Sequence, residues 1–429
     1  MTKIIIDTDP GVDDVLAILL ALKSAHVDIR LISLCFGNCT TQDSLRNLLT
    51  LFHVLEKDRL AAAAQGQEPA PISRPTIAVG MTTALDGSML DATDFHGDDG
   101  LGNVHQHLPH HTAPAEWAAL FQDTVATEQA AAAEAHQQLP FVPSAAPSYN
   151  EILRVLQEEP AGTVTIVALG PLMNVARAAA ADPTTFARVR RVVSMGGTLR
   201  LPGNVTPYAE FNVFSDAQAA AAVYNLTGVV INAAGEGAPP RGLDLTIFPL
   251  DITSRHFLAE PEYMALLAAR GLQPNPENVH QLVPIADGVA AVPPLLEWCH
   301  AWLTTTFATM RNIFGHDLMT PEERVAAGPV IIEMHDPLAL WYAIQEDDNT
   351  TSWTVESGLD IRVETLGEFT RGMTVHDTRG RAKRSEPTKN DFGKWLLASH
   401  GNVVTVARES PYQDGEFGRV LLETVFGPY

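Results

Sequence analysis

The chain has 429 residues, of which 46% are hydrophobic, so it can bury a large core as one large α/β domain or as two smaller ones. Its 28 Lys and Arg residues stand against 51 Asp and Glu residues, and the resulting formal charge of −23 would repel a nucleic-acid backbone or an anionic membrane over most of the surface. A small neutral substrate is therefore favoured, with neither nucleic acid nor membrane as a partner.

The cysteine content and the N-terminal residues bear on the compartment. Three cysteines (Cys35, Cys39 and Cys299) are too few for a disulfide framework and favour a reducing environment. Only three isoleucines precede Asp7, which leaves no room for the apolar segment of a signal peptide, and no later apolar run is long enough to span a bilayer. We therefore expect a cytoplasmic protein.

The first predicted elements gather four carboxylates at one point. Ile4 to Ile6 predict a short buried strand, Pro10-Gly11 a tight turn, and the apolar spacing from Val15 to Leu22 a helix. The carboxylates lie at the end of this strand and the start of this helix: Asp7, Asp9, Asp13 and Asp14. Like charges this close raise each other's pKa or repel, unless a hard cation such as Ca²⁺ neutralises them. The last two acids are also suited to capping the helix.

Further along the chain, strand-like runs alternate with helical patterns, which predicts βαβ units and a mainly parallel sheet. The predicted strands are 29–34, 163–169, 191–195 and 229–233, and the predicted helices cover 44–55 and a stretch beginning at Asn174. Polar or glycine-rich residues follow these strands, at the sheet edge where open parallel sheets bind ligands.

Three stretches interrupt this alternation, and we interpret them as surface insertions or lids: 57–75, 104–147 and 270–328. The alanine-rich part of the second stretch is predicted to be helical. That stretch begins with the tract His105–His111, which looks like a metal-binding tract but is more typical of a solvated loop. Near the C-terminus, the alternating residues 362–365 and the turn-rich residues 368–373 predict an antiparallel hairpin.

The sequence then resembles a known family. The segment Asp7-Thr8-Asp9-Pro10-Gly11-Val12-Asp13-Asp14 is similar to the signature of the inosine-uridine preferring nucleoside hydrolases. Further segments follow in that family's order up to about residue 380: 37–38, 96–97, 168–172 with Asn174, 195–197, 209–212, 335–337 and 370–375. The resemblance implies a single α/β domain over residues 1–429, built around a mostly parallel, Rossmann-like central sheet with surface insertions. It also implies a homo-oligomer, a dimer or a tetramer.

The resemblance further implies a Ca²⁺-dependent hydrolysis of the N-glycosidic bond of ribonucleosides, which gives ribose and a free base. Carried over residue by residue, it makes Asp9, Asp14 and Asp336 side-chain ligands of Ca²⁺, together with the backbone carbonyl of Leu169. Residues that match ribose contacts are Asp13, Asn38, Asn204, Glu210 and Asn212. In the same pattern Asp9 removes a proton from water.

The resemblance also implies that two histidines interact with the leaving base. His335 is placed to act as the acid and His96 to contact the base, although each histidine would also suit a purely hydrogen-bonded place in the pocket. By its local pattern alone, Asp336 followed by Pro337 also suits a helix start.

Two other classes of function remain open at this point. The order Asp7-Thr8-Asp9 after a strand is also typical of haloacid-dehalogenase phosphatases, but Gly11 and the pair Asp13-Asp14 depart from that pattern. A non-catalytic Ca²⁺-dependent ribose-binding protein would keep the ligands yet need no proton acceptor or leaving-group acid, so the presence of Asp9 and His335 favours an enzyme.

The preferred base is not predicted. Four residues are candidates for contact with it, although their helical spacing favours core packing: Trp298, Trp302, Phe307 and His316.

Overall fold

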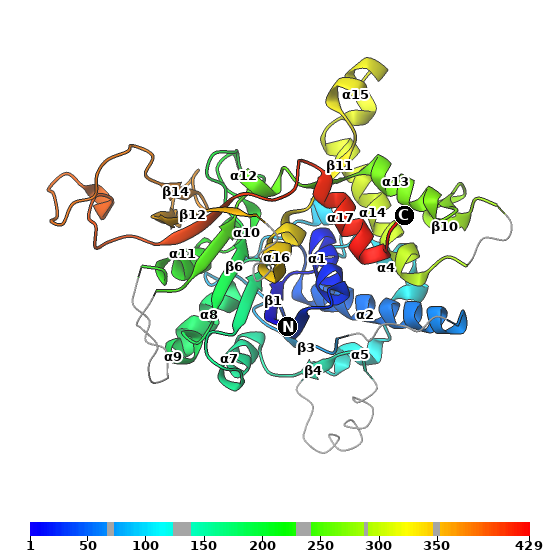
Figure 1. Ribbon diagram of the computed structural model, residues 1–429, viewed down its shortest axis with the longest axis horizontal. Coiled ribbons are helices and arrows are strands. Elements are labelled where there is room, and N and C mark those ends of the chain that lie inside the picture. The colour runs from blue at the N-terminus through cyan, green and yellow to red at the C-terminus, as the bar shows by residue number, and fades with distance from the viewer. Residues whose placement is uncertain (67–72, 123–138, 229–241, 287–290, 346–351) are drawn as a thin grey trace.

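A nine-stranded sheet runs through the molecule (Figure 1) in a computed structural model that describes residues 1–66, 73–122, 139–228, 242–286, 291–345 and 352–429. Neighbouring strands are parallel except at one edge, where β12 and β15 are antiparallel. The strands lie in the order β12 (Thr354–Leu359), β15 (Val404–Glu409), β7 (Leu245–Phe248), β6 (Arg191–Met195), β5 (Val164–Ala168), β1 (Thr2–Thr8), β2 (Val27–Leu34), β3 (Thr76–Val79) and β4 (Val142–Ser144). The predicted α/β fold with a mostly parallel sheet is confirmed.

Both faces of the sheet are covered, which explains why its central strands are apolar throughout. Successive side chains of a strand point to opposite faces, so Ile4 and Ile6 join one hydrophobic core while Ile5 joins the other. The first core is completed by α1 (Val12–Lys23), α2 (Thr41–Ala64), α14 (Pro294–Ile313), α16 (His335–Gln345) and α17 (Glu416–Phe426). The second is completed by α7 (Ser148–Glu158), α8 (Met173–Ala181) and α11 (Ala217–Asn225).

The predicted elements agree with the structure in most cases. The strand at 4–6 is the centre of β1, the strand at 191–195 is β6, and the strand at 163–169 contains β5. The helix predicted at 44–55 extends in both directions to form α2, and the C-terminal hairpin is β13 (Ile361–Val363) paired antiparallel with β14 (Thr374–His376). The strand predicted at 229–233 and most of the alanine-rich helix lie outside the described residues.

The three interrupting stretches contain short elements around the sheet. Residues 57–64 continue α2, and the second stretch contributes α4 (Val104–His107), η1 (Pro109–His111), α5 (Ala115–Ala119) and β4. The third holds the β9 (Leu272–Asn275) and β10 (Asn278–Pro284) hairpin, α14, η2 (His316–Leu318) and α15 (Pro321–Ala327), which projects from the body in Figure 1. Within this third stretch α14 is part of the core, because Trp298, Trp302 and Phe307 are fully buried.

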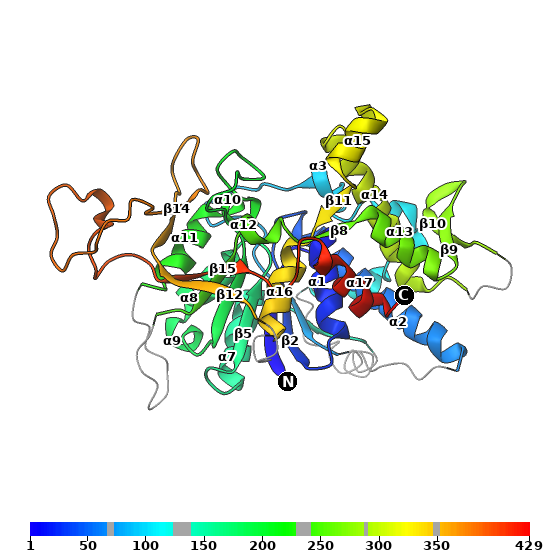
Figure 2. The same cartoon turned by 45° about the horizontal axis from the view of Figure 1, so that its top comes forward.

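The carboxyl ends of the central strands all point to one side of the sheet. Figure 2 shows α3 (Thr93–His96), α10 (Phe211–Ser215) and β11 (Ile331–Glu333) on this side and the N-terminus on the opposite side. The remaining short elements are α9 (Pro183–Phe186), α12 (Leu250–Thr253), β8 (Phe257–Ala259), α13 (Glu260–Ala269) and η3 (Phe392–Lys394). No helix in the described ranges is both long and apolar enough to cross a membrane.

Candidate active site

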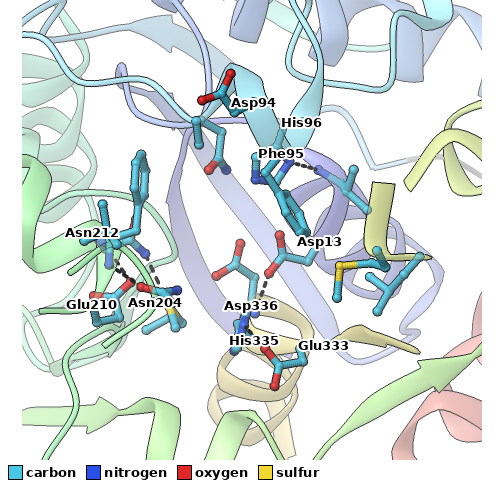
Figure 3. A pocket seen from close by; sticks show the side chains of 18 of the residues that line it. Asp13, Asp94, Phe95, His96, Asn204, Glu210, Asn212, Glu333, His335 and Asp336 are labelled. Carbon is cyan, nitrogen blue, oxygen red and sulfur yellow. Dashed lines mark hydrogen bonds and ion pairs between the residues drawn. The ribbon is translucent and has the colours of Figure 1, made fainter. Parts of the chain in front are cut away.

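A cavity of about 480 Å³ opens at the carboxyl ends of the central strands (Figure 3). The turn after β1, helix α3, the start of α10, the end of α14 and the junction between β11 and α16 all contribute to its walls. Most of the residues predicted for the site line it: Asp13, Asn38, His96, Leu169, Asn204, Glu210, Asn212, His335 and Asp336. The fold therefore brings together residues that the resemblance assigns to the site and that are up to 323 positions apart in the sequence.

Three carboxylates form a cluster at this cavity, of which Asp13 and Asp336 line the cavity and Asp14 is buried behind its lining. Oxygens of Asp13, Asp14 and Asp336 all lie within 4.8 Å of one another. Burial raises the pKa of Asp13 to about 6, with a further contribution from the charge of Asp14, and burial together with Asp13 and Asp14 raises the pKa of Asp336 well above its ordinary value. Such a cluster is stabilised either by bound protons or by a cation.

Two helix starts position these acids. Gly11 is the N-cap residue of α1, and its backbone N–H donates to Asp14 Oδ2 at 3.1 Å, so the predicted capping role of Asp14 is present together with its place in the cluster. Asp336 is the second residue of α16 rather than its cap, and its backbone N–H donates to Asp13 Oδ2 at 3.4 Å. Because helix N-termini favour negative charge, both helix dipoles stabilise the cluster.

Asp9 lies beside the cluster with its two carboxylate oxygens in different surroundings. Its Oδ2 accepts a 2.7 Å hydrogen bond from the backbone N–H of Asn38, whereas its buried Oδ1 has no hydrogen-bond partner among the described residues. Burial raises the pKa of Asp9 well above its ordinary value, and the charge of Asp14 raises it further.

Two glycines leave the space that the Asp9 carboxylate occupies. A Cβ atom on Gly37 would lie 2.0 Å from Asp9 Oδ2, and one on Gly170 would lie 2.2 Å from Asp9 Oδ1. These two positions therefore require glycine for a steric reason, and the carboxylate is held in place from both sides.

Amide side chains and Glu210 form another part of the cavity wall, which we call the amide wall. Asn38 Nδ2 donates to Asp14 Oδ2 at 2.8 Å, and Asn212 Nδ2 donates to the carbonyl oxygen of Leu169 at 2.6 Å. Glu210 caps α10, because its oxygens accept hydrogen bonds from the backbone N–H groups of residues 197, 212 and 213. Burial nevertheless raises the pKa of Glu210. These side chains are fixed by their partners, which suits the recognition of a rigid polyol.

The remaining predicted ribose contact is more exposed than the others. Asn204 is an exposed residue at the edge of the cavity, and its Oδ1 accepts a 2.9 Å hydrogen bond from the backbone N–H of Phe211. This bond fixes the loop before α10.

His335 makes contacts through both ring nitrogens. Its Nδ1 lies 2.7 Å from Thr253 Oγ1, and its Nε2 lies 3.2 Å from Glu333 Oε2. Burial opposes protonation, but the hydrogen bond and charge of Glu333 outweigh it and raise the pKa of His335. The surroundings of His335 therefore favour protonation more than those of an ordinary histidine do.

The pKa of His96 is shifted in the opposite direction to that of His335. His96 is buried at the end of α3, where its Nδ1 accepts a 3.4 Å hydrogen bond from the backbone N–H of Val12. Burial lowers its pKa to about 3, helped by the charge of His335, so His96 is neutral at pH 7.

Sequence reasoning missed several residues of this cavity. Glu333, the last residue of β11, was not singled out, although it lies only two residues before His335, the first residue of α16. An apolar part of the wall, formed by Phe95, Met310, Ile313 and Phe314, was also not predicted. Of the four proposed base contacts, Trp298, Trp302 and Phe307 are core residues and His316 lies outside the cavity.

Asp7 belongs to a layer beneath the cavity. Its Oδ1 accepts hydrogen bonds from Ser33 Oγ at 2.5 Å and from Asn174 Nδ2 at 2.9 Å, and burial raises its pKa to about 6. Of the four N-terminal acids, this one is therefore a support for the strand ends.

Comparisons with known proteins agree with this geometry. The family model described as inosine-uridine preferring nucleoside hydrolase matches residues 4–402. A probable uridine nucleosidase 2 of Oryza sativa subsp. japonica is 30% identical over 273 residues, 63% of this chain and 62% of that protein. The chain thus spans less than two thirds of the length of this protein and of the similar uridine nucleosidase 1 of Arabidopsis thaliana. The non-specific ribonucleoside hydrolase RihC of Salmonella enteritidis PT4 is 28% identical over 378 residues, 88% of each chain.

Solved structures share the fold. A plant nucleoside hydrolase, the PpNRh1 enzyme, superposes with a TM-score of 0.64 at 22% identity, over 100% of this chain and 99% of its own. An inosine-guanosine nucleoside hydrolase superposes with a TM-score of 0.62 at 21% identity, over 99% of this chain and 98% of its own.

Proposed function

The chain belongs to the inosine-uridine preferring nucleoside hydrolase family, and on this premise we propose that it hydrolyses the N-glycosidic bond of ribonucleosides to ribose and a free base in a Ca²⁺-dependent reaction. The observation that carries the proposal is the carboxylate cluster of Asp13, Asp14 and Asp336, which Asp13 and Asp336 present to a cavity that is also lined by apolar side chains. One end of such a cavity suits the sugar, and the other suits a planar base.

The residues present fit a Ca²⁺ ion. The cluster offers only oxygen ligands, which Ca²⁺ prefers, and the unpartnered Oδ1 of Asp9 is a further buried oxygen beside it. We propose that Asp9, Asp14, Asp336 and the carbonyl oxygen of Leu169 hold the ion. When bound, Ca²⁺ would neutralise these carboxylates and polarise the oxygens of sugar and water.

The sugar would lie between the cluster and the amide wall. Asp13, Asn38, Asn204, Glu210 and Asn212 are the proposed contacts to its hydroxyl groups, and all five line the cavity. An oxocarbenium-like transition state carries positive charge near C1′, which the surrounding carboxylates and amide oxygens would stabilise.

Proton transfer is assigned to two residues. We propose that the Asp9 carboxylate also accepts a proton from the attacking water. His335 would donate a proton to the departing base, and its contact with Glu333 supports the protonated form. His96 is neutral at pH 7, so it would contact the base through a neutral ring.

The base would lie against the apolar wall. Ile313 and Phe314 are exposed, Phe95 is half-buried, and Met310 is buried. Aromatic and aliphatic side chains accept purines and pyrimidines alike, so this wall does not by itself favour one class.

The direct experiment is a panel of ribonucleosides assayed for free ribose, with and without a Ca²⁺ chelator. We expect ribose from at least one substrate, loss of activity with chelator, and a much lower rate on the 2′-deoxy analogue, because a missing hydroxyl leaves polar groups of the site unpaired. Equal rates on ribo- and deoxyribonucleosides would contradict the proposal. Release of phosphate from phosphomonoesters, with no ribose released, would favour the phosphatase alternative. Binding without turnover would favour the non-catalytic Ca²⁺-dependent ribose-binding protein.

A further inference from the structure

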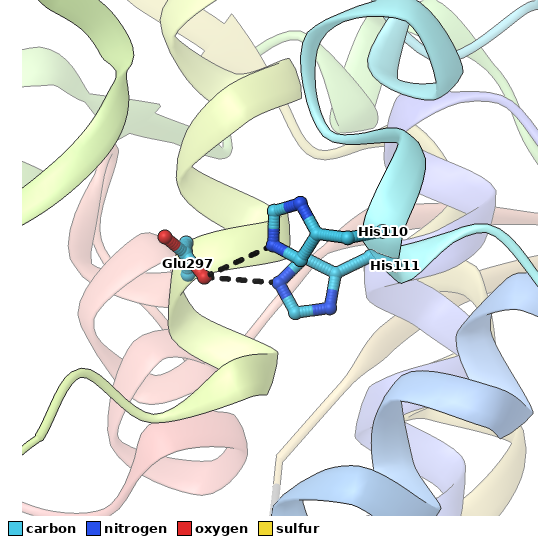
Figure 4. Close-up of side chains that lie close together, drawn as sticks. All are labelled: His110, His111 and Glu297. Carbon is cyan, nitrogen blue, oxygen red and sulfur yellow. Dashed lines mark hydrogen bonds and ion pairs between the residues drawn. The ribbon is translucent and has the colours of Figure 1, made fainter.

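A second cluster of side chains that could bind a metal lies outside the active-site cavity. His110 and His111 of η1 face Glu297 of α14, and Figure 4 shows both rings directed at the same carboxylate oxygen. We propose that His110, His111 and Glu297 form a binding site for a first-row transition metal, with Zn²⁺ as the favoured ion. None of these residues lines the active-site cavity.

The distances fit a tetrahedral ion. His111 Nε2 and His110 Nε2 lie 3.0 and 3.7 Å from Glu297 Oε2, and the three ligand atoms all lie within 4.8 Å of one another. In a tetrahedral site with Zn–N and Zn–O bonds of about 2.0–2.2 Å, ligand atoms are separated by roughly 3.3–3.5 Å. The observed separations lie on either side of this range, so small side-chain rotations would admit the ion.

The ligand types distinguish this site from the carboxylate cluster. Two imidazole nitrogens and one carboxylate oxygen suit Zn²⁺, whereas Ca²⁺ takes oxygen ligands almost exclusively. The two clusters therefore differ in the class of cation that their ligands favour.

The chain holds the three ligands in place before any ion binds. His111 is 4% exposed, and the carbonyl oxygen of His110 accepts a 2.5 Å hydrogen bond from Lys57 Nζ of α2. The positive charge of Lys57 opposes a divalent cation, so we expect moderate affinity. The His110 side chain is 55% exposed, which leaves an approach for the ion and room for a water as the fourth ligand.

The other histidines of the tract have different partners. His105 lies 2.9 Å from Asn47 Oδ1, and the His107 ring stacks on that of His280 with centroids 3.6 Å apart. The site therefore uses two adjacent histidines of the tract and a glutamate 186 positions from His111. A bound ion would fasten η1 to α14, the helix whose far end supplies Met310 and Ile313 to the active-site cavity.

The test uses Zn²⁺ and Co²⁺ as probes on the full chain, first stripped with a chelator and then supplied with excess Ca²⁺ to occupy the carboxylate cluster. We expect one equivalent of Zn²⁺ by calorimetry and a tetrahedral Co²⁺ absorption spectrum. His110→Ala and Glu297→Gln should each weaken binding at least about tenfold. Glu297→Gln keeps an acceptor for His111, and His110 is exposed, so both variants should fold, as circular dichroism will show.

His107→Ala is the matched control, because it removes a histidine of the same tract from outside the cluster. It should keep the Zn²⁺ affinity and the Co²⁺ spectrum of the parent. The proposal is overturned if the parent binds no Zn²⁺ under these conditions, or if the affinity is unchanged in both His110→Ala and Glu297→Gln. In either case the contact between His111 and Glu297 is only a hydrogen bond between η1 and α14.

Discussion

At the scale of single residues, the Asp9 carboxylate has one oxygen that accepts a hydrogen bond from Asn38 and one buried oxygen with no partner among the described residues. Asp9→Asn keeps an oxygen for the Asn38 N–H but cannot take a proton from water, so we expect turnover to fall by at least about three orders of magnitude. Binding of ribose, measured by calorimetry with Ca²⁺ present, should survive in part. A variant that retained most of its turnover would show that Asp9 is not the base.

The role of His335 can be separated from general damage to the site by the choice of leaving group. A nitrophenyl riboside needs no proton on its leaving group, so His335→Ala should hydrolyse it at close to the parent rate and act far more slowly on natural nucleosides. Glu333→Gln keeps a neighbour for His335 Nε2 but removes its negative charge, and it should show a weaker form of the same selectivity. An equal loss of rate on both kinds of substrate would show that His335 only shapes the pocket and does not donate the proton.

At the scale of elements, the site depends on the starts of α1 and α16, which bring Asp13, Asp14 and Asp336 together. Ca²⁺ should raise the melting temperature, because an ion that binds only the folded state at 100 times its Kd adds about 2.7 kcal/mol to the free energy of unfolding. Asp14→Ala and Asp336→Ala should lose this increase and bind Ca²⁺ far more weakly in calorimetry.

Asp94→Ala serves as the control for these variants. Asp94 lines the same cavity but lies outside the carboxylate cluster, so this variant should keep the Ca²⁺-dependent rise in melting temperature. Normal Ca²⁺ affinity in both Asp14→Ala and Asp336→Ala would contradict the proposed metal site.

The elements that the sequence predicts well are those with a strong local pattern. The apolar run in β1 is sufficient to predict a strand, and the apolar spacing of α1 is sufficient to predict a helix. The acids where the two elements meet indicate the site. The strand β4 was not predicted and lies within one of the predicted insertions, because it is only three residues long and contains Pro143. A sheet tolerates proline at an edge position, which β4 occupies.

The apolar wall of the cavity could not be predicted from local sequence patterns, for a different reason. Met310 and Ile313 end the same helix whose earlier residues, Trp298 and Trp302, are core, and periodicity does not tell which end of a buried helix reaches a cavity. The base-binding region depends on tertiary packing, whereas the carboxylates are specified by a motif. The insertion boundaries and the homo-oligomer remain predictions.

At the scale of the whole molecule, several histidines are buried in neutral form, and this makes stability depend on pH. Burial lowers the pKa of His105, His256 and His300 to about 4 each. Because unfolding restores the ordinary pKa of about 6.5, each histidine contributes stability above pH 6.5 that is lost progressively as the pH falls toward 4. The loss approaches about 1.4 kcal/mol per pH unit for each proton taken up on unfolding.

His300 allows this effect to be measured apart from the carboxylates, whose raised pKa values act in the opposite direction. His300→Gln should be less stable than the parent at pH 7, because it disturbs contacts with Tyr263 and the carbonyl of Val279. The difference between the two free energies of unfolding should shrink as the pH falls from 6.5 to 5, since only the parent has this histidine to protonate. Urea unfolding at several pH values, with excess Ca²⁺, measures it, and a constant difference would exclude this role.

The contact between Asp13 and the backbone of Asp336 joins positions 323 residues apart, which has a consequence for synthesis of the chain. A nascent polypeptide carries its crowded N-terminal acids through nearly the whole of translation before α16 emerges to complete the site. Contacts so distant in sequence also form late in folding, since the entropy of closing a long loop must be overcome first. Nucleosidase activity in a translation reaction should therefore appear abruptly, after β15 (Val404–Glu409) has left the ribosome, and should report completed folding of the entire sheet.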